Sequence, residues 1–139
     1  MAFVRLVNPR NFDKRRMEFK NYVFKNSTGG GASVFDFECA IRKSQSICSH
    51  IYEFYGDVGG KPAAYWVFDL SEIQPTSGDP ITCRQRTSSS GDKCHHNIEG
   101  ATNGHLRRLA EKWELNDISF CHEDGVRPLT LDDVPDSDV

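Results

Sequence analysis

Residues 63–70, AAYWVFDL, restrict the fold of this chain more than any other segment. They form its most apolar stretch, and apolar and polar side chains do not alternate along them. Such a run is typical of a strand that is buried on both faces, because a half-exposed strand carries a polar side chain at every second position. We expect residues 63–70 to lie at the centre of a sheet.

Shorter segments with strand-like composition precede and follow this run. They are residues 2–7, 17–25, 32–37, 81–85 and 117–122. Pro9 should end the first strand, since proline cannot donate a hydrogen bond to a neighbouring strand. Residues 26–33, NSTGGGAS, resemble a loop and lack the lysine and following helix of a phosphate-binding loop.

Two segments have helical spacing. Between Ala40 and Tyr55, apolar residues recur every three or four positions, and Ser44-Gln45-Ser46 offers a cap and a break. After Thr102, a good capping residue, apolar side chains repeat through Trp113. Strands around two main helical regions, without a regular β-α rhythm, predict an α+β fold with a mostly antiparallel or mixed sheet.

The length of 139 residues fits one domain with one core. We expect a single domain at residues 1–131 and an acidic, partly disordered tail at residues 132–139. No apolar run is long enough to span a membrane. Five cysteines form an odd set without a CxxC pair, which favours reduced thiols and a cytoplasmic location.

Charge is unevenly distributed, although the net charge is only -3. Residues 1–26 are rich in arginine and lysine, and residues 121–139 are rich in aspartate. This pattern indicates either a basic patch for a phosphate-bearing partner with a solubilising tail, or two chain ends that neutralise each other. The sequence leaves both interpretations open.

The segment CHHN, Cys94 to Asn97, places four side chains that can act in catalysis or bind a metal next to one another. In a strand, Cys94, His96 and Ile98 would share the buried face, while His95 and Asn97 would face solvent or a cleft. As catalytic candidates we name His95 and His96 as acid/base groups and Asn97 as the orienting group, with Arg5 and either Arg84 or Arg86 neutralising charge. A purely structural role for the cysteine and histidines is the alternative.

A zinc site is a further alternative, because thiolate and imidazole are the ligands that zinc prefers. Its candidate ligands are Cys94, His96, Cys121 and His122.

Phosphate binding has its own candidates. Cationic and aromatic residues interleave between residues 10 and 25, a mixture that binds phosphates and stacks on bases. The alternative without a ligand is an edge strand whose lysines prevent pairing with the sheet of another molecule. The predicted ligand-binding set is Arg5, Arg15, Arg16, Lys20, Tyr22, Arg84 and Arg86.

The layout of an arginine on the first strand, an SVF strand after a glycine loop and a later histidine and glutamate is similar to that of small NAD-using ADP-ribosyl transferases. The resemblance implies roles for Arg5, Ser33 and either Glu99 or Glu123.

The leading functional prediction is a protein that binds or processes a phosphate-bearing ligand, a nucleotide or nucleic acid, near the CHHN strand. A non-catalytic module that binds a protein partner is the alternative from another class. The ADP-ribosyl transferase activity is a third.

Overall fold

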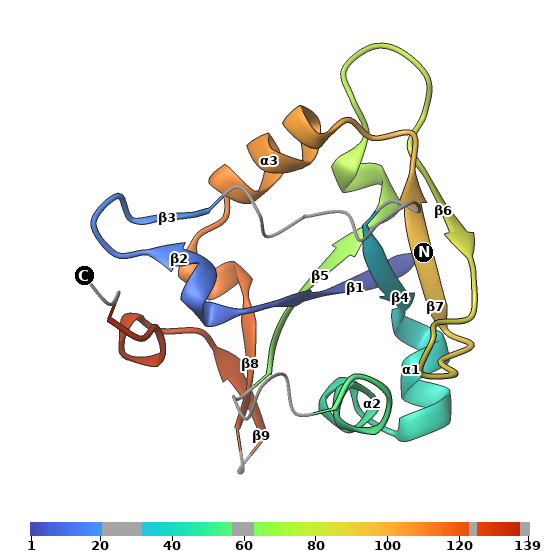
Figure 1. Cartoon of the computed structure of the whole chain (residues 1–139), viewed down its shortest axis with the longest axis horizontal. Coiled ribbons are helices and arrows are strands. Elements are labelled where there is room, and N and C mark those ends of the chain that lie inside the picture. Colours follow the sequence, from blue (N-terminus) through green and yellow to red (C-terminus); the bar gives the residue numbers. More distant parts are fainter. Residues whose placement is uncertain (21–31, 57–62, 123–124, 137–139) are drawn as a thin grey trace.

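A computed structural model describes residues 1–20, 32–56, 63–122 and 125–136 (Figure 1). Within them, one antiparallel sheet is built from β1 (Ala2–Val7), β4 (Ser33–Asp36), β5 (Ala64–Asp69), β6 (Thr82–Gln85), β7 (His95–Glu99), β8 (Ser119–His122) and β9 (Gly125–Pro128). The order is β6-β7-β4-β1-β5-β8-β9, and every pair is antiparallel. Two further strands, β2 (Phe12–Asp13) and β3 (Glu18–Phe19), form a separate hairpin. The α+β fold class predicted from the sequence is confirmed.

The apolar segment 63–70 forms β5, an interior strand between β1 and β8. The middle of the sheet is β1, one position away from the expected strand. Ala64, Tyr65, Trp66 and Phe68 are buried, whereas Val67 is 37% exposed. Burial on both faces is therefore confirmed for most of this strand.

Helices cover the two faces of the sheet. One core cluster joins Phe3 and Trp66 of the sheet to Leu106 of α3 (Asn103–Glu111) and Phe19 of the hairpin. A second cluster joins Val4, Phe35 and Tyr65 to α1 (Phe37–Ser44) and α2 (Ile47–Phe54). In Figure 1, α3 and the α1–α2 pair lie on opposite sides of the strands. This cover explains why β5 shows no alternation.

The helix boundaries follow local capping chemistry. α1 ends at Ser44, Gln45 adopts a φ of 72°, and the Ser46 hydroxyl accepts a hydrogen bond from the Ser49 N–H at the start of α2. Thr102 caps α3 through the N–H of His105, 3.1 Å away. The predicted break at 44–46 and the predicted cap are both confirmed. In the described part of the chain, no helix has the length and apolar character needed to cross a membrane.

The expectation of reduced thiols is wrong for four of the five cysteines, all of which lie in described segments. Cys39 of α1 is bonded to Cys94 before β7, and Cys48 of α2 is bonded to Cys121 of β8. Each helix is thereby tied to a different part of the sheet. Cys83 keeps its thiol, and burial raises its pKa to about 12.

The acidic end of the chain packs against the domain as far as residue 136. Arg127 donates to both carboxylate oxygens of Asp133, each at 2.6 Å, and Val134 is 2% exposed. Lys14 of the basic segment donates to Asp136 at 2.8 Å. The two oppositely charged ends of the chain therefore meet.

Candidate functional site

His95, His96 and Asn97 of the CHHN segment lie in β7, between β4 and β6, and Cys94 directly precedes this strand. His96 and Ile98 share one face of this strand, and His95 and Asn97 share the other, as expected from alternation. The expectation that Cys94 shares the face of Ile98 is wrong, because Cys94 precedes the strand and belongs to the core cluster of α1 and α2, whereas Ile98 belongs to the other cluster. The expectation that His95 and Asn97 face solvent or a cleft is also wrong, because each is only 7% exposed. The second face of the sheet is covered as well as the first, which alternation within one strand does not reveal.

The two histidines make structural contacts. His95 Nδ1 lies 2.6 Å from the carbonyl oxygen of Arg86, and His96 Nδ1 lies 2.9 Å from that of Cys94. The His96 ring meets the Phe3 ring edge-on at 5.1 Å. These contacts are those of side chains that stabilise a strand, so the catalytic roles of His95, His96 and Asn97 stay a prediction from sequence alone.

The predicted zinc ligands Cys94, His96, Cys121 and His122 do not form a site. The sulfur atoms of Cys94 and Cys121 belong to different disulfides. The strands β4, β1 and β5 also separate β7 from β8, which amounts to ~19 Å at the usual spacing between strands. This set is corrected because sequence spacing carries no information on strand order.

The predicted arginines are dispersed over the sheet. Arg5 lies on β1, where its guanidinium donates to the carbonyl oxygen of Ser33 at 2.6 Å and burial lowers its pKa to about 10. Arg84 and Arg86 are exposed at the β6 edge, three strands from β1. Arg5 thus does not combine with them to neutralise one ligand.

The residues of the ADP-ribosyl transferase layout also do not converge on one face. Arg5 donates a hydrogen bond to the backbone oxygen of Ser33. Register and alternation place Ser33 and Glu99 on the face opposite Arg5. Glu123 and Tyr22 lie outside the described residues.

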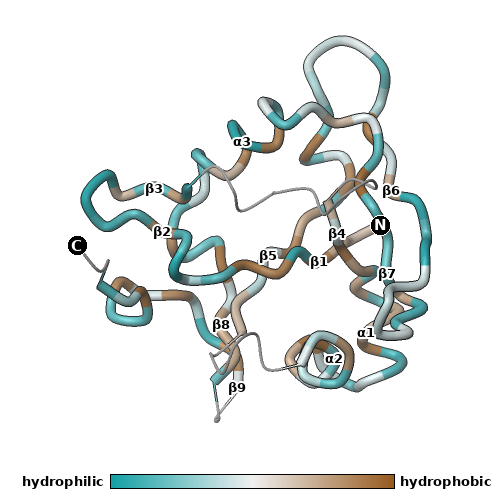
Figure 2. The backbone as a smooth tube through the Cα atoms, in the orientation of Figure 1, coloured by the Kyte–Doolittle hydropathy of each residue, from teal (hydrophilic) through white to brown (hydrophobic). Residues whose placement is uncertain are grey.

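A pocket of about 650 Å³ gathers the cations of the N-terminal segment. This basic pocket is lined by Asn8, Arg10, Asn11, Phe12, Asp13, Lys14, Arg15, Lys20, Pro135 and Asp136. It lies at the β2–β3 hairpin, on the opposite side of the molecule from β6 (Figure 1). Figure 2 shows the turn of the hairpin as strongly hydrophilic. Two predicted ligand-binding residues, Arg15 and Lys20, contribute to it.

Hydrogen bonds between residues close together in the chain shape the pocket wall. Asn8 caps a short 3₁₀ turn at Pro9–Asn11 by accepting a hydrogen bond from the Arg10 N–H. Asp13 accepts from the N–H groups of Arg15 and Arg16, which closes the hairpin turn. The Lys20 N–H donates to the Asn11 carbonyl at 2.7 Å. The backbone that carries these cationic side chains is thus held by hydrogen bonds.

Both carboxylates of the pocket, Asp13 and Asp136, accept hydrogen bonds from other residues of the chain. The hydrogen bond from the Arg16 N–H is the main cause that lowers the pKa of Asp13 below its ordinary value. Lys14 lowers the pKa of Asp136. Among the described lining residues, four cations outnumber these two acids, so the lining carries a net positive charge.

Of the aromatic residues described in this segment, Phe12 lies in the pocket wall and Phe19 does not line the pocket. Phe12 and Phe19 are buried, their rings meet edge-on at 5.1 Å, and Phe19 packs against Trp113 at 5.6 Å. They anchor the hairpin to the core. These buried rings offer little surface for stacking on bases, and Tyr22 lies outside the described residues. The predicted gathering of cations has a structural counterpart in the basic pocket.

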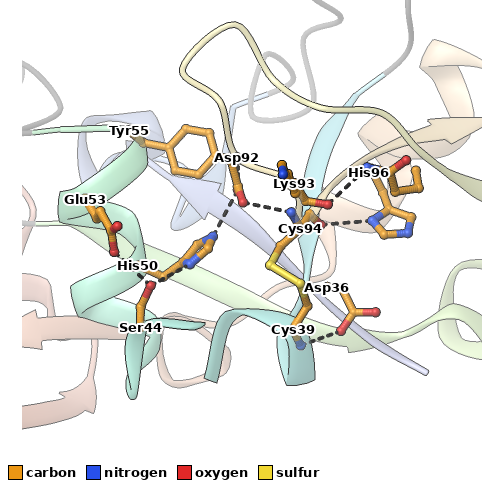
Figure 3. The surroundings of a disulfide bond; sticks show 11 residues. Asp36, Cys39, Ser44, His50, Glu53, Tyr55, Asp92, Lys93, Cys94 and His96 are labelled. Carbon is orange, nitrogen blue, oxygen red and sulfur yellow. Dashed lines mark hydrogen bonds and ion pairs between the residues drawn. A yellow bond between two sulfur atoms is a disulfide. The ribbon is translucent and has the colours of Figure 1, made fainter. Parts of the chain in front are cut away.

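A second constellation lies beside the Cys39–Cys94 disulfide (Figure 3). His50 Nε2 lies 3.0 Å from Asp92 Oδ2, and His50 Nδ1 lies 3.0 Å from the Ser44 hydroxyl. Asp92 also accepts hydrogen bonds from the Tyr55 hydroxyl and from the Cys94 N–H. We call Ser44, His50, Tyr55 and Asp92 the buried histidine network.

The network has the connectivity of a Ser-His-Asp triad but a different environment. His50 and Asp92 have no exposed surface, and the imidazole packs at 4.8 Å against both Phe35 and Phe54. The Ser44 hydroxyl also lies 3.1 Å from Glu53 Oε2. A substrate cannot reach the imidazole to exchange a proton with it, so this geometry favours stabilisation over nucleophilic catalysis.

Neither acidic partner, Asp92 for His50 or Asp136 for Lys14, is predicted from the sequence. Asp92 is 42 residues from His50, and Asp136 is 122 residues from Lys14. The sequence does indicate that His50 is buried, because it lies between Ile47 and Ile51 on the apolar stripe of its helix. A histidine on such a stripe needs a buried partner.

Comparisons of the chain with protein-family models, with curated proteins and with solved structures found no match, so the functional argument depends on geometry.

Proposed function

We propose that the basic pocket binds a phosphate-bearing ligand, such as a nucleotide or the backbone of a nucleic acid. The observation that carries this proposal is the convergence of Arg10, Lys14, Arg15 and Lys20 on one pocket. Its volume of about 650 Å³ lies within the range of small-ligand sites. Arginine and lysine together supply the directed hydrogen bonds and the point charges that phosphate oxygens accept.

The lining favours recognition of the phosphate over recognition of the base. Asn8 and Asn11 add polar groups, whereas the Phe12 and Phe19 rings are buried. Binding should therefore depend little on sequence and steeply on salt. The Lys14–Asp136 contact shows that a carboxylate already occupies part of the site, so an incoming anion has to compete with the chain's own C-terminal segment.

Charge reversal tests the pocket. The Arg10→Glu/Arg15→Glu variant should bind inorganic tripolyphosphate and a single-stranded oligonucleotide at least about tenfold more weakly at low salt, because two attractive contacts become repulsive. Titration calorimetry at two salt concentrations measures the loss.

The matched control is Arg84→Glu/Arg86→Glu, which changes the net charge equally at the β6 edge. It should alter affinity less than about twofold. Equal losses in both variants would show a non-specific effect of charge. Preferential binding of polyglutamate over tripolyphosphate would instead favour the protein-interaction alternative.

The two disulfides provide information on the compartment in which the protein functions. Disulfides persist mainly in oxidising compartments, whereas cytosolic thiols are kept reduced. The cytoplasmic location expected from the thiols loses that support, and we infer that the disulfide-bonded form works in an oxidising compartment.

A further inference from the structure

Four side chains with metal-ligand chemistry meet beside α1 and α2. Single ligand atoms of His50, Asp92 and Cys94 lie within 4.8 Å of one another, and all three residues are buried. The sulfur of Cys39 is bonded to that of Cys94, so a fourth donor adjoins the group. Figure 3 shows these residues converging from α1, α2 and the segment before β7.

We propose that reduction of the Cys39–Cys94 disulfide converts this cluster into a closed zinc site with Cys39, Cys94, His50 and Asp92 as ligands. A thiol or phosphine reductant supplies two electrons, the S–S bond breaks, and two protons give two thiols. Zinc binding then releases both thiol protons as the thiolates coordinate the metal. The oxidised protein has no thiolate to offer here.

For His50, Asp92 and Cys94 the geometry requires only small movements, while the Cys39 sulfur has to move away from the Cys94 sulfur once their bond is broken. Ligand atoms around a tetrahedral zinc lie about 3.3–3.8 Å apart, given metal–ligand distances of about 2.0–2.3 Å. The three ligand atoms already lie within 4.8 Å of one another, so shifts of about 1 Å bring them into range. The complete burial of His50 and Asp92, which argues against catalysis, suits a structural zinc site.

Hydrogen bonds that orient a metal ligand are also present. His50 Nε2 points at Asp92, so it is the nitrogen that would coordinate zinc, leaving the proton on Nδ1. Nδ1 can then donate to the Ser44 oxygen while the Ser44 hydroxyl donates to Glu53, which uses both observed contacts. Asp92 keeps its second oxygen on the Cys94 N–H. These contacts would orient the His50 ring in a metal-bound form.

The test uses the full chain, a phosphine reductant and Co²⁺ alone as a spectroscopic probe. Reduced protein should bind one equivalent, with the visible bands and sulfur-to-metal charge transfer of tetrahedral thiolate coordination. Zn²⁺ should displace the Co²⁺, and the oxidised protein should show neither signal. His50→Ala should weaken binding at least about tenfold, and Ser44→Ala about tenfold, as for residues that orient a ligand.

The two cysteine pairs provide matched controls under reducing conditions. Cys48→Ser/Cys121→Ser should retain the site, and Cys39→Ser/Cys94→Ser should abolish it. Circular dichroism of the same samples reports folding. If the reduced chain is unfolded, Zn²⁺ should restore the native spectrum in the first variant but not in the second. Absence of binding by the reduced wild type, or equal binding by both variants, would overturn the proposal.

Discussion

Replacing Asp92 with alanine is expected to lower the free energy of unfolding by about 3–5 kcal/mol, the usual cost of removing one partner of a buried polar pair. Asp92 accepts hydrogen bonds from His50, Tyr55 and the Cys94 N–H, and it has no exposed surface. Burial and the Asp92 carboxylate raise the pKa of Tyr55 well above its ordinary value, so its hydroxyl keeps the proton that it donates. The substitution leaves the His50 ring and the Cys94 N–H buried without this acceptor, and the partly exposed Tyr55 hydroxyl loses one partner.

Urea denaturation followed by tryptophan fluorescence measures this loss, because Trp66 and Trp113 lie in the core. Asp79, an exposed aspartate, provides the control, and Asp79→Ala should change the free energy of unfolding by less than about 0.5 kcal/mol. A loss below about 1 kcal/mol for Asp92→Ala would contradict the role given to the network.

Removing the Cys39–Cys94 disulfide with serine substitutions should cost about 4 kcal/mol in oxidising buffer. The bond closes a loop across a separation of 55 residues, and loop-closure entropy predicts a loss of this size. The Cys48–Cys121 bond spans 73 residues, and because the dependence on length is logarithmic its removal should cost nearly the same.

Cys83→Ser controls for the chemistry of the substitution, since Cys83 is half-buried and carries a thiol. Its effect should be the smallest of the three, because no covalent link is lost. Denaturation midpoints of the three variants, measured without reductant, provide the comparison. Equal stability of the wild type and both disulfide variants would contradict the account of how α1 and α2 are held on the sheet.

Local features of the fold could be predicted from the sequence, because each depends on residues close together in the chain. The apolar run at 63–70, the break at Ser44-Gln45-Ser46 and the Thr102 cap all belong to this class. Strand order and the cysteine pairs could not be predicted, since both depend on which distant segments meet. The disulfide partners are 55 and 73 residues apart.

The candidate sites also contain parts that depend on residues close together in the chain and parts that depend on distant segments. The cations of the basic pocket are mostly close in sequence, so composition pointed to Arg15 and Lys20. The Pro135–Asp136 wall and the His50–Asp92 pair arise from chain topology. The exposure predicted for His95 and Asn97 is wrong, because alternation tells which residues share a face but not whether that face is covered.

The most direct test of the basic pocket is an NMR titration of the ¹⁵N-labelled protein with inorganic tripolyphosphate at low salt. We expect the largest shifts at the backbone amides of Arg10, Lys14, Arg15 and Lys20, with further shifts at Asp136 as its contact with Lys14 is displaced. The same shifts should disappear at high salt. Saturable shifts confined to β6 and β7, or no shifts at millimolar tripolyphosphate, would contradict this expectation.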